Sequence, residues 1–524
     1  MTDTATIPTQ LMNVPVKRFE DVMPAQDAVV TDLELAQLPL NDYGNSLRLL
    51  HRHGKDLLAV SRVGWHVWDG KRYARELGEA NAMKKCHEVA VAMAAERAAL
   101  KATAPQKLKD NASEDEQKKH GEQQRLHDGK LDRFSRFMTS TGNITRIKAM
   151  LASAEPYLVR APNVIDADPW LFNCANGTLD LQRALDQGLE DDEADPRLRP
   201  HDRRDLLTKL APIDFDRAAP APNFTAFLER IQPDPSVRTF LQTWFGYCIS
   251  GDVSEQKMVI MHGLGSNGKS TLINAIVNVM GDYSATLDIS SFLASREKRG
   301  GEATPDLARL PGTRLVVASE PDAGARLNES SVKVITGGER MAVRQLFQEQ
   351  FEFEPSFKVV ISCNHRPTIR GQDHGIWRRI LVVPFNVTMT NDQKDPHLNR
   401  KLAAEGPGIL SWLLDGLTLY RERGLVVPDA IADAIEDYRN ESDPIGQFLK
   451  SCTIPTPHVG PQAERVRAAE LYDRYVAWSK ENAQEAISTT AFGKRMIDRG
   501  FKRHKVGISY YMGLRLMTEE EMHD

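Results

Sequence analysis

A glycine-rich stretch, GLGSNGKST, runs from residue 263 to residue 271 and contains the residue types that bind phosphate. Gly263, Gly265 and Gly268 allow the backbone to curl so that successive N–H groups face an anion. Lys269 can then reach the β and γ phosphates of a nucleotide, and the Ser270 hydroxyl can be a magnesium ligand. The same loop also contains Ser266, Asn267 and Thr271. Because the full GxxxxGK[ST] spacing is present, ATP with Mg²⁺ is the first ligand to consider, although kinases, transporters, GTPases and motors share this pattern.

Three further polar elements, a carboxylate, an amide and an arginine pair, lie at predicted strand ends downstream of the loop. Glu320 follows the apolar run RLVVA and could polarise a water molecule for attack on a γ phosphate. Asn364 follows KVVIS and could hold that water, while Arg378 and Arg379 could neutralise transition-state charge, often from a neighbouring subunit. Singly, these residues equally suit a surface acid, a strand-end cap and solvated arginines. Together and in this order they favour an ATPase, with the choice between the two arginines left open.

The candidate magnesium ligands are Ser270 and Glu320. Many ATPases carry a pair of acids after the second strand, but here Ser319 precedes Glu320. We therefore expect the ion to be held through water on the acid side, with Ser270 as the main protein ligand. The acidic run at residues 190–193 could suggest a second metal site, but no other carboxylate cluster lies on a convincing strand, so we favour a solvated loop.

These residues need a sheet that brings several strand ends together. The expected strands are short apolar runs at residues 258–261, 314–318, 358–362 and 379–384. Such runs suit strands buried on both faces of an α/β sheet, and a helix-compatible run at 272–280 follows the loop. We predict an ATPase core over residues 233–395, followed by a helical extension over 396–454.

Upstream of this core, short helical and strand-like patterns alternate. We predict a loosely ordered leader over residues 1–36 and a mainly helical domain with short hairpins over 37–232. Asp69-Gly70 and Asn176-Gly177 mark two tight hairpin turns between apolar runs. The polar stretch at 104–124 suits either an exposed connection or a solvated helix. Helices are expected at 42–53, 81–103, 224–231 and 237–249, and strands at 57–60 and 65–73.

The C-terminal region has a pattern of its own. A linker is predicted over residues 455–464, and a small domain over 465–524. Helices at 468–482 and 490–499, followed by an alternating run, favour a winged-helix-like domain. Its cationic residues are candidates for DNA contact, although a packing module with solvated lysines would show the same charges. These candidates are Lys494, Arg495, Lys502, Arg503 and Lys505.

The composition sets outer bounds on this interpretation. With 524 residues and 41% hydrophobic content, the chain can bury two or three cores of ordinary size. No apolar run has the length of a membrane span and no secretory signal is present, so we expect a protein of the bacterial cytoplasm. The five cysteines form no CxxC pair, which argues against a zinc ribbon or a disulfide framework. A formal net charge of -5 excludes a uniformly basic surface but not a local basic face.

The motifs as a set resemble a known family. GLGSNGKST, RLVVASEPD, KVITGGERMAVR, FKVVISCNHRP and IWRRILVVPF are similar to the superfamily 3 helicase core of phage, plasmid and poxvirus primase-helicases. Upstream, YGNSLRLLHRHG, WHVWDGKRY and NCANGTLDL are similar to the helical domain that precedes the motor in that family. The resemblance covers most of the chain, from about Asp42 onward.

This resemblance implies an AAA+ type ring, expected to be a hexamer, that hydrolyses ATP at subunit interfaces and moves 3′ to 5′ along one DNA strand. Lys269 and Ser270 would bind phosphate and magnesium, Glu320 would activate water, and Asn364 would be the sensor. The stretch GGERMAVRQLFQEQFEF would form a hairpin that grips the DNA backbone without contacting bases. Its candidate contacts are Lys333, Arg340, Arg344 and Phe347.

Two other functions are compatible with parts of the sequence. An ATP-dependent origin-binding initiator or helicase loader would use the same loop for assembly and would not unwind DNA processively. A P-loop kinase would give no role to Arg378 and Arg379. We expect no primer synthesis by this chain, because only about forty loosely patterned residues precede the helical region, so a separate primase or polymerase is an expected partner.

Overall fold

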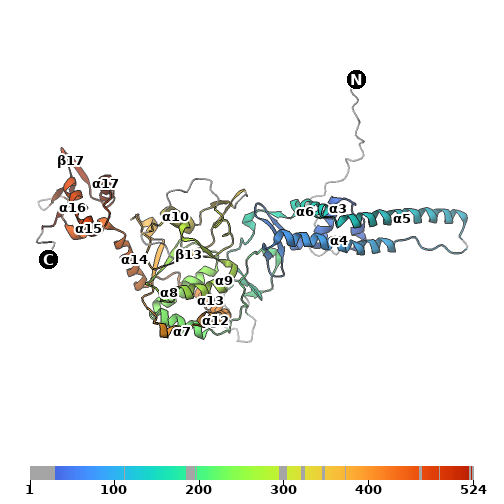
Figure 1. Ribbon diagram of the computed structural model, residues 1–524, viewed down its shortest axis with the longest axis horizontal. Helices are drawn as coiled ribbons and strands as arrows, with labels where there is room; N and C mark the ends of the chain where they lie inside the picture. The colour runs from blue at the N-terminus through green and yellow to red at the C-terminus, as the bar shows by residue number, and fades with distance from the viewer. Residues whose placement is uncertain are drawn as a thin grey trace, which may run out of the picture.

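The computed structural model describes residues 30–110, 112–183, 195, 197–293, 304–319, 325–344, 349–371, 373–458, 463–482, 484–518 and 521. The described chain forms three parts along its longest axis, as Figure 1 shows. A helical N-terminal part extends to one side, a sheet with helices on both faces lies in the centre, and a small C-terminal part lies at the other end. Among the described residues, no helix combines the length and the apolar character that crossing a bilayer requires.

Five helices build most of the N-terminal part. They are α2 (Asp32–Ala36), α3 (Asp42–His53), α4 (Gly78–Ala102), α5 (Glu114–Thr141) and α6 (Ile144–Leu158). Leu49, Cys86 and Ile147, from α3, α4 and α6, are fully buried in one cluster. Helix α5 begins after Ser113 with a capping box to Glu116 and buries few of its side chains. The second half of the polar stretch, whose structure the sequence left open, is therefore a solvated helix, and α4 and α5 form the long hairpin of Figure 1.

Both hairpins predicted from the Asp-Gly and Asn-Gly pairs are confirmed. The first strands are β1 (Leu57–Val60), β2 (Gly64–Trp68), β3 (Tyr73–Ala74) and β4 (Val159–Arg160), in the order β3-β2-β1-β4. A second small sheet contains β5 (Leu171–Cys174), β6 (Gly177–Asp180) and β7 (Leu198–Arg199). Short 3-10 turns η2 (Gly54–Asp56), η3 (Pro162–Val164) and η4 (Arg203–Asp205) connect these elements. The acidic run at 190–193 and residues 1–29 of the expected leader lie outside the described residues.

The central sheet contains five parallel strands in the order β14-β8-β13-β10-β9. They are β8 (Met258–His262), β9 (Ser284–Leu287), β10 (Leu315–Ser319), β13 (Lys358–Cys363) and β14 (Ile380–Pro384). Alternate side chains enter two different clusters: Val259 and Met261 face one, and Met258 and Ile260 face the other. This double burial explains the continuous apolar runs in the sequence, and the four strands predicted from those runs are confirmed.

Helices cover both faces of this sheet. One face packs on α7 (Pro222–Ile231), α8 (Pro235–Ile249), α9 (Lys269–Met280) and α13 (Gly406–Arg423). The other face packs on α10 (Glu329–Gly337), the hairpin of β11 (Met341–Arg344) and β12 (Gln350–Phe353), α11 (His374–Trp377) and α14 (Asp429–Glu441). The remaining connections are η5 (Gly281–Tyr283), η6 (Ile289–Ser291), η7 (Asn391–Gln393) and α12 (Leu398–Ala404).

The C-terminal part is built around its own cluster of buried aromatic side chains. Its elements are α15 (Pro444–Cys452), β15 (Thr453–Pro455), β16 (Arg465–Arg467), α16 (Ala468–Glu481), α17 (Thr489–Asp498), β17 (Arg503–Val506), β18 (Ile508–Met512) and β19 (Leu514–Leu516). Phe448 of α15 contacts the rings of Tyr475, Trp478 and Phe492. The packed unit therefore extends upstream of residue 465, where the sequence places its start, and β15 pairs with β19 across the expected linker.

Candidate nucleotide-binding site

The glycine-rich loop connects the end of β8 to the first turn of α9. Gly265 and Gly268 have φ values of 94° and 80°, and Ser266 has a φ of 50°. These left-handed conformations reverse the chain within a few residues, which is why glycine occupies two of the three positions. The first N–H groups of α9 have no acceptor within the helix itself, so a helix start at this loop favours an anion.

Lys269 lies at the centre of this loop, and its side chain is buried. Its Nζ donates to the Gly263 carbonyl at 2.7 Å, to Asn267 Oδ1 at 3.1 Å and to Asn364 Oδ1 at 3.3 Å. Asn364 directly follows β13, the neighbour of β8 in the sheet. The fold thus brings the predicted lysine and the predicted sensor within hydrogen-bonding distance, although 95 residues separate them.

The loop fits closely against the core at two of its glycines. A Cβ atom on Gly263 would lie 2.3 Å from the Phe385 carbonyl oxygen, and one on Gly268 would lie 2.5 Å from Ile231 Cγ2. Asn267 Nδ2 also donates to the Phe385 carbonyl at 3.3 Å. The core-facing side of the loop is therefore packed against Phe385 and Ile231, and a ligand can reach only the opposite side.

The side chains at the start of α9 fit the predicted roles in position. Ser270 is exposed and Thr271 is half-buried in the first turn. A hydroxyl group beside the phosphate-binding backbone is a hard oxygen donor of the kind that Mg²⁺ prefers. The residues present therefore fit a magnesium nucleotide, with Ser270 as the ligand that this chain offers directly.

Sequence reasoning missed the segment that follows β14. Lys394 Nζ donates to Ser266 Oγ at 3.3 Å, and the Met389 N–H donates to the Ser266 carbonyl at 2.8 Å. A pocket of about 640 Å³ lies between this segment and α7, lined by Phe227, Arg230 and the side of the loop. Its volume suits a small-molecule ligand. No motif marks Lys394, because its position depends on how the chain returns after the last strand.

The electrostatic environment of the loop is positive. Burial lowers the pKa of His262, the last residue of β8, and the nearby cations Arg366 and Lys269 lower it further. The imidazole is thus held neutral beside the side chains of Arg366 and Lys269. This field favours an anionic ligand over a cationic one.

The predicted catalytic acid cannot be placed. Ser319 is the exposed last residue of β10, and β10 lies beside β13 in the sheet. Glu320, which follows it, lies outside the described residues, as does Phe347 of the predicted DNA hairpin. The end of β10 does lie on the sheet edge that carries the loop, since the strands are parallel.

Arg378 and Arg379 lie at the opposite edge of the sheet. The Arg379 carbonyl accepts from the N–H of Met258, the first residue of β8, whereas the loop follows the last residue of that strand. Roughly 15 Å of strand separates the two edges. Arg378 is exposed and donates to Gln256 Oε1 at 2.8 Å. Within one chain, the arginines and the loop are therefore not brought together.

Arg379 is the more enclosed of the two arginines. It is half-buried, and it donates to Thr336 Oγ1 and to the Gly375 carbonyl, both at 3.1 Å. Burial lowers the pKa of Arg379, and the charge of Arg378 adds to this effect. The two guanidinium groups thus form a small positive patch on the arginine edge, with Arg378 the freer to move.

The predicted DNA hairpin is present as the antiparallel pair β11 and β12. Arg340 forms an exposed ion pair with Glu354 at 2.9 Å, and Lys333 forms one with Asp373 at 3.1 Å. Arg344 is exposed at the end of β11 nearest the hairpin tip. Such exposed pairs are weak and exchange readily, so all three cations are accessible to a polyanion.

The cationic residues of the C-terminal part fall into two groups. Lys494 and Arg495 of α17 line a cleft that faces the central part, where Arg495 donates to the Arg370 carbonyl at 3.3 Å. Lys502, Arg503 and Lys505 are exposed on and before β17. The five candidates therefore do not form one continuous face.

Comparisons with known proteins match both main parts of the chain. The family model described as "D5 N terminal like" matches residues 46–233, and the model described as "Family of unknown function (DUF5906)" matches residues 261–379. A protein of Acanthamoeba polyphaga mimivirus, provisionally named a helicase, is 30% identical over 336 residues, which are 61% of this chain and 34% of that protein. A protein of African swine fever virus, provisionally named a primase, is 23% identical over 379 residues, which are 67% of this chain and 38% of that protein.

Among solved structures, the apo structure of the NrS-1 C-terminal region is 13% identical, with a TM-score of 0.39 over 57% of this chain and 76% of that chain. This chain spans about a third of the length of the curated relatives it matches. The fold defines a mixed α/β protein with a helical N-terminal part and a parallel sheet. In its matched N-terminal region and in its viral relatives, the chain is similar to phage and viral primase-helicases.

Proposed function

We propose that the protein is an ATP-dependent replicative DNA helicase of a phage, prophage or plasmid, with a superfamily 3 motor of the AAA+ type. The observation that carries this proposal is the meeting of Lys269 with Asn364 at one edge of the parallel sheet, while Arg378 and Arg379 lie at the other edge. A complete ATPase site would then need a second copy of the chain to supply its arginine.

The described residues can be given roles in hydrolysis. Lys269 would bind the β and γ phosphates, Asn364 would hold the attacking water, and the backbone N–H groups of the loop would orient the triphosphate. Ser270 would bind magnesium, which neutralises charge on the β and γ phosphate oxygens. Glu320 remains the proposed residue that activates the water.

A ring of subunits follows from a site shared between copies. We propose a hexamer that moves 3′ to 5′ along single-stranded DNA, with the β11–β12 hairpin contacting the backbone through Arg344, Arg340 and Lys333. The C-terminal part would be a winged-helix-like DNA-binding module that uses Lys502, Arg503 and Lys505. Forked DNA is the proposed substrate, and a separate primase or polymerase is a proposed partner.

Strand displacement on a forked substrate tests this function. The full chain is expected to separate the strands in the presence of ATP and Mg²⁺, and single-stranded DNA is expected to stimulate its ATP hydrolysis. Lys269→Ala should abolish both activities, because it removes the ammonium group that stabilises the phosphates. Lys130→Ala, at an exposed position on α5, is the matched control and should leave both unchanged.

The outcome also separates the proposal from its nearest rival. An assembled protein that hydrolyses ATP but never displaces a strand would support an initiator or loader instead. Full ATPase activity in Lys269→Ala would exclude both the helicase and the initiator or loader, because each is proposed to use this lysine.

A further inference from the structure

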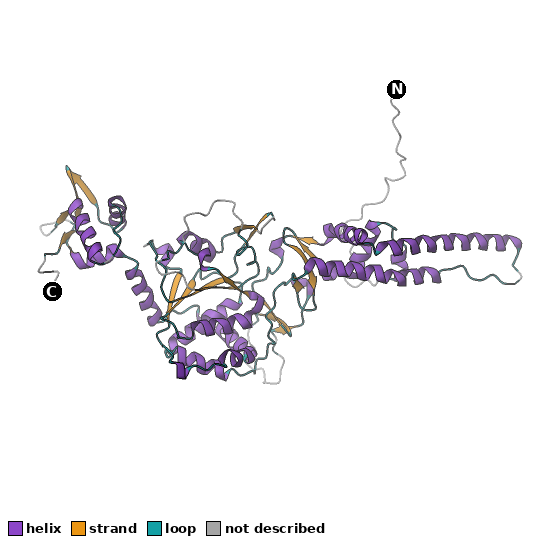
Figure 2. Ribbon diagram, in the orientation of Figure 1, coloured by secondary structure: helices purple, strands orange, loops and turns teal. Residues whose placement is uncertain are grey.

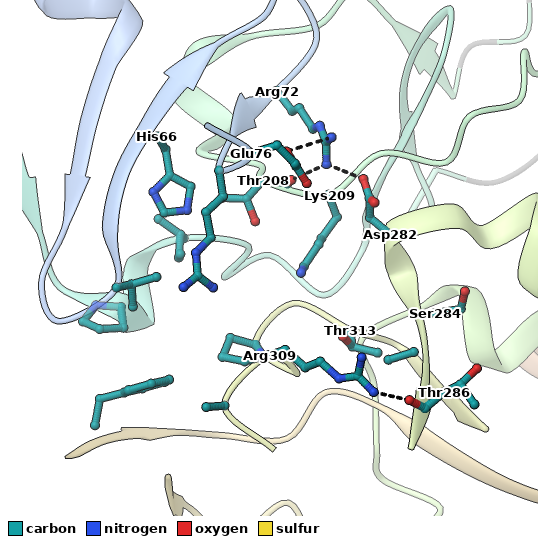
Figure 3. A pocket seen from close by; sticks show the side chains of 18 residues that line it. His66, Arg72, Glu76, Thr208, Lys209, Asp282, Ser284, Thr286, Arg309 and Thr313 are labelled. Carbon is teal, nitrogen blue, oxygen red and sulfur yellow. Dashed lines mark hydrogen bonds and ion pairs between the residues drawn. The ribbon is translucent and has the colours of Figure 1, made fainter. Parts of the chain in front are cut away.

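A second pocket lies where the N-terminal part meets the central sheet. We name it the junction pocket; its volume is about 610 Å³. One wall comes from β2, the β3 region and the segment around Lys209, and the opposite wall comes from β9 and residues 308–313, as Figure 3 shows. The pocket shares no lining residue with the pocket beside the glycine-rich loop.

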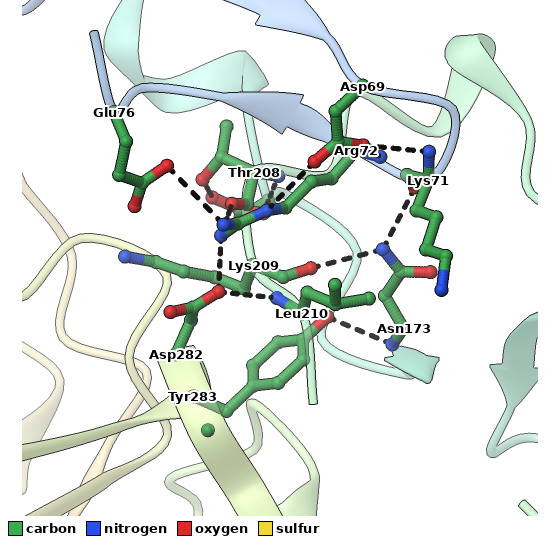
Figure 4. A network of polar contacts seen from close by, with 12 residues as sticks. Asp69, Lys71, Arg72, Glu76, Asn173, Thr208, Lys209, Leu210, Asp282 and Tyr283 are labelled. Atoms are coloured by element: carbon green, nitrogen blue, oxygen red, sulfur yellow. Dashed lines mark hydrogen bonds and ion pairs between the residues drawn. The ribbon is translucent and has the colours of Figure 1, made fainter. Parts of the chain in front are cut away.

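The wall of the junction pocket is fixed by a polar network centred on Arg72 (Figure 4). Arg72 donates to the Thr208 carbonyl at 3.0 Å and forms ion pairs with Asp282 and Glu76. Asp282 Oδ2 also accepts from the Leu210 N–H at 3.1 Å. These contacts neutralise Arg72 and hold the segment that carries Lys209, so the wall is pre-organised.

Two other cations that line this pocket, Lys209 and Arg309, form no ion pair with any described residue. Lys209 forms no hydrogen bond or ion pair through its ammonium group with any residue that the structure describes, and Arg309 donates only to the Thr286 carbonyl. In Figure 3, Lys209 extends into the pocket from one wall, and Arg309 lies along the opposite wall with its guanidinium group at Thr286. Burial lowers the pKa of Lys209; the nearby carboxylates of Asp166 and Asp282 oppose this shift, and Arg72 and Arg75 add to it. A half-buried ammonium group that has no hydrogen-bonded partner among the described residues is stabilised by an incoming anion.

The junction pocket also adjoins the β11–β12 hairpin. Phe351 of β12 lines it, and Arg62, from the turn between β1 and β2, donates to the Gln350 carbonyl at 2.8 Å. Arg62 also forms an ion pair with Glu349 at 3.1 Å. On the other wall, the Thr304 N–H donates to the Arg344 carbonyl at 3.0 Å. The segment that carries Arg309 therefore contacts the hairpin at Thr304.

We propose that the junction pocket binds phosphate groups of single-stranded DNA through Lys209 and Arg309, next to the strand held by the β11–β12 hairpin. The inference rests on the proposed helicase function and adds a contact made by the N-terminal part. Cations on two opposite walls suit a backbone that passes between them, because phosphates are contacted without regard to base sequence. The Arg72 network joins the Lys209 wall to Asp282, which precedes β9, and so fixes the spacing between the two walls.

The salt dependence of DNA binding tests this inference. The full chain is titrated with a fluorescent dT20 oligonucleotide at several salt concentrations, and the slope of log affinity against log salt is measured. Each lost phosphate contact should reduce the steepness of this slope by about 0.7 for single-stranded DNA. Lys209→Gln combined with Arg309→Gln should therefore flatten the slope by roughly 1.4. Arg423→Gln, an exposed arginine on α13 outside the pocket, is the matched control and should leave the slope unchanged.

Each alternative outcome has a distinct meaning. DNA-independent ATP hydrolysis should stay unchanged in the double variant, because neither residue contacts the glycine-rich loop. If the wild type binds no dT20 at all, the proposed function and this inference both fail. If the wild type binds but the double variant keeps the full slope, or loses no more than Arg423→Gln, only the pocket assignment fails.

Binding of inorganic phosphate alone is measured in parallel by calorimetry. Loss of phosphate binding in the double variant with an unchanged dT20 slope would show a free-anion site and would overturn the proposal. If Lys209→Gln fails to fold, Arg309→Gln alone is used, because Arg309 is exposed and its substitution should leave the chain folded. This single variant should flatten the slope by about 0.7, and an unchanged slope would contradict the proposal.

Discussion

Lys269 and Asn364 show how far chemistry at the residue scale follows from sequence order alone. Both follow strands that were recognised as short apolar runs, and the carboxyl ends of parallel strands meet at one sheet edge. The contact between their side chains at 3.3 Å is the consequence. The glycines around Lys269 differ in their surroundings, and for two of them the stability cost of an alanine substitution can be compared.

Gly265 and Gly268 both have positive φ values but different surroundings. Alanine at Gly265 would find no atom within 4 Å of its Cβ, so we expect only the conformational cost, about 1–2 kcal/mol. Alanine at Gly268 would also contact Ile231 Cγ2 at 2.5 Å, which should add about 1–3 kcal/mol. Urea unfolding of the two variants measures the difference. Equal losses of stability would show that the α7 contact is not tight.

Other residues of the candidate site could not be predicted in this way. Lys394 and the Phe385 carbonyl reach the loop because the chain after β14 folds back along it. No spacing rule specifies that return, since it depends on packing against α7 and α12. The arginines were identified as a pair, but only the sheet register shows that they lie at the far edge from Lys269.

At the scale of elements, long patterns were predictable and short edge strands were not. The four strands predicted for the central sheet and both Asx-Gly hairpins carry strong local signals. By contrast, β15 and β19 have three residues each and pair across about sixty residues of chain, so neither has a local pattern. Helix α15 was assigned to the extension upstream, yet Phe448 packs among the rings of the C-terminal part.

The Arg72 network connects the β2–β3 hairpin to Asp282, in the turn that directly follows α9. A double-mutant cycle with Arg72→Ala and Asp282→Ala should give a coupling energy of about 1 kcal/mol, moderated by partial exposure of the aspartate. The exposed pair of Arg340 and Glu354 is the control, and we expect no measurable coupling there. Thermal unfolding of the single and double variants provides the four values. Strictly additive losses of unfolding free energy for Arg72→Ala and Asp282→Ala would show that this ion pair does not contribute to stability.

At the scale of the whole molecule, one buried and several half-buried histidines predict a loss of stability in mild acid. Burial is the leading cause that lowers the pKa of five of them below the usual value of 6.5, namely His51, His53, His66, His201 and His262. The unfolded chain therefore binds more protons below pH 6.5 than the folded chain does. The free energy of unfolding should fall as pH decreases from about 7 to 5.

Denaturant unfolding at a series of pH values measures this dependence. His66→Gln should reduce the slope between pH 7 and 5, because it removes one of the buried groups. His87→Gln, at an exposed position on α4, should leave the slope as it is. A free energy of unfolding that stays constant or rises toward pH 5 would contradict the assignment of these histidines as neutral in the folded state.

The whole-molecule geometry also bears on how the proposed ATPase site would be completed. The loop edge and the arginine edge of one sheet face opposite ways, so identical copies in a ring would place the arginines of one beside the loop of the next. A chain that worked alone would need another cation near Lys269 for the transition state.

Mixing inactive variants tests this central claim most directly. Lys269→Ala and the double variant Arg378→Ala/Arg379→Ala should each lose ATP hydrolysis when assembled alone. In a random equal mixture, roughly a quarter of the interfaces would join an intact loop to intact arginines, so about that fraction of wild-type turnover should return. Mixed assemblies that remain inactive, or an arginine variant that hydrolyses ATP at the wild-type rate, would contradict a site shared between two copies.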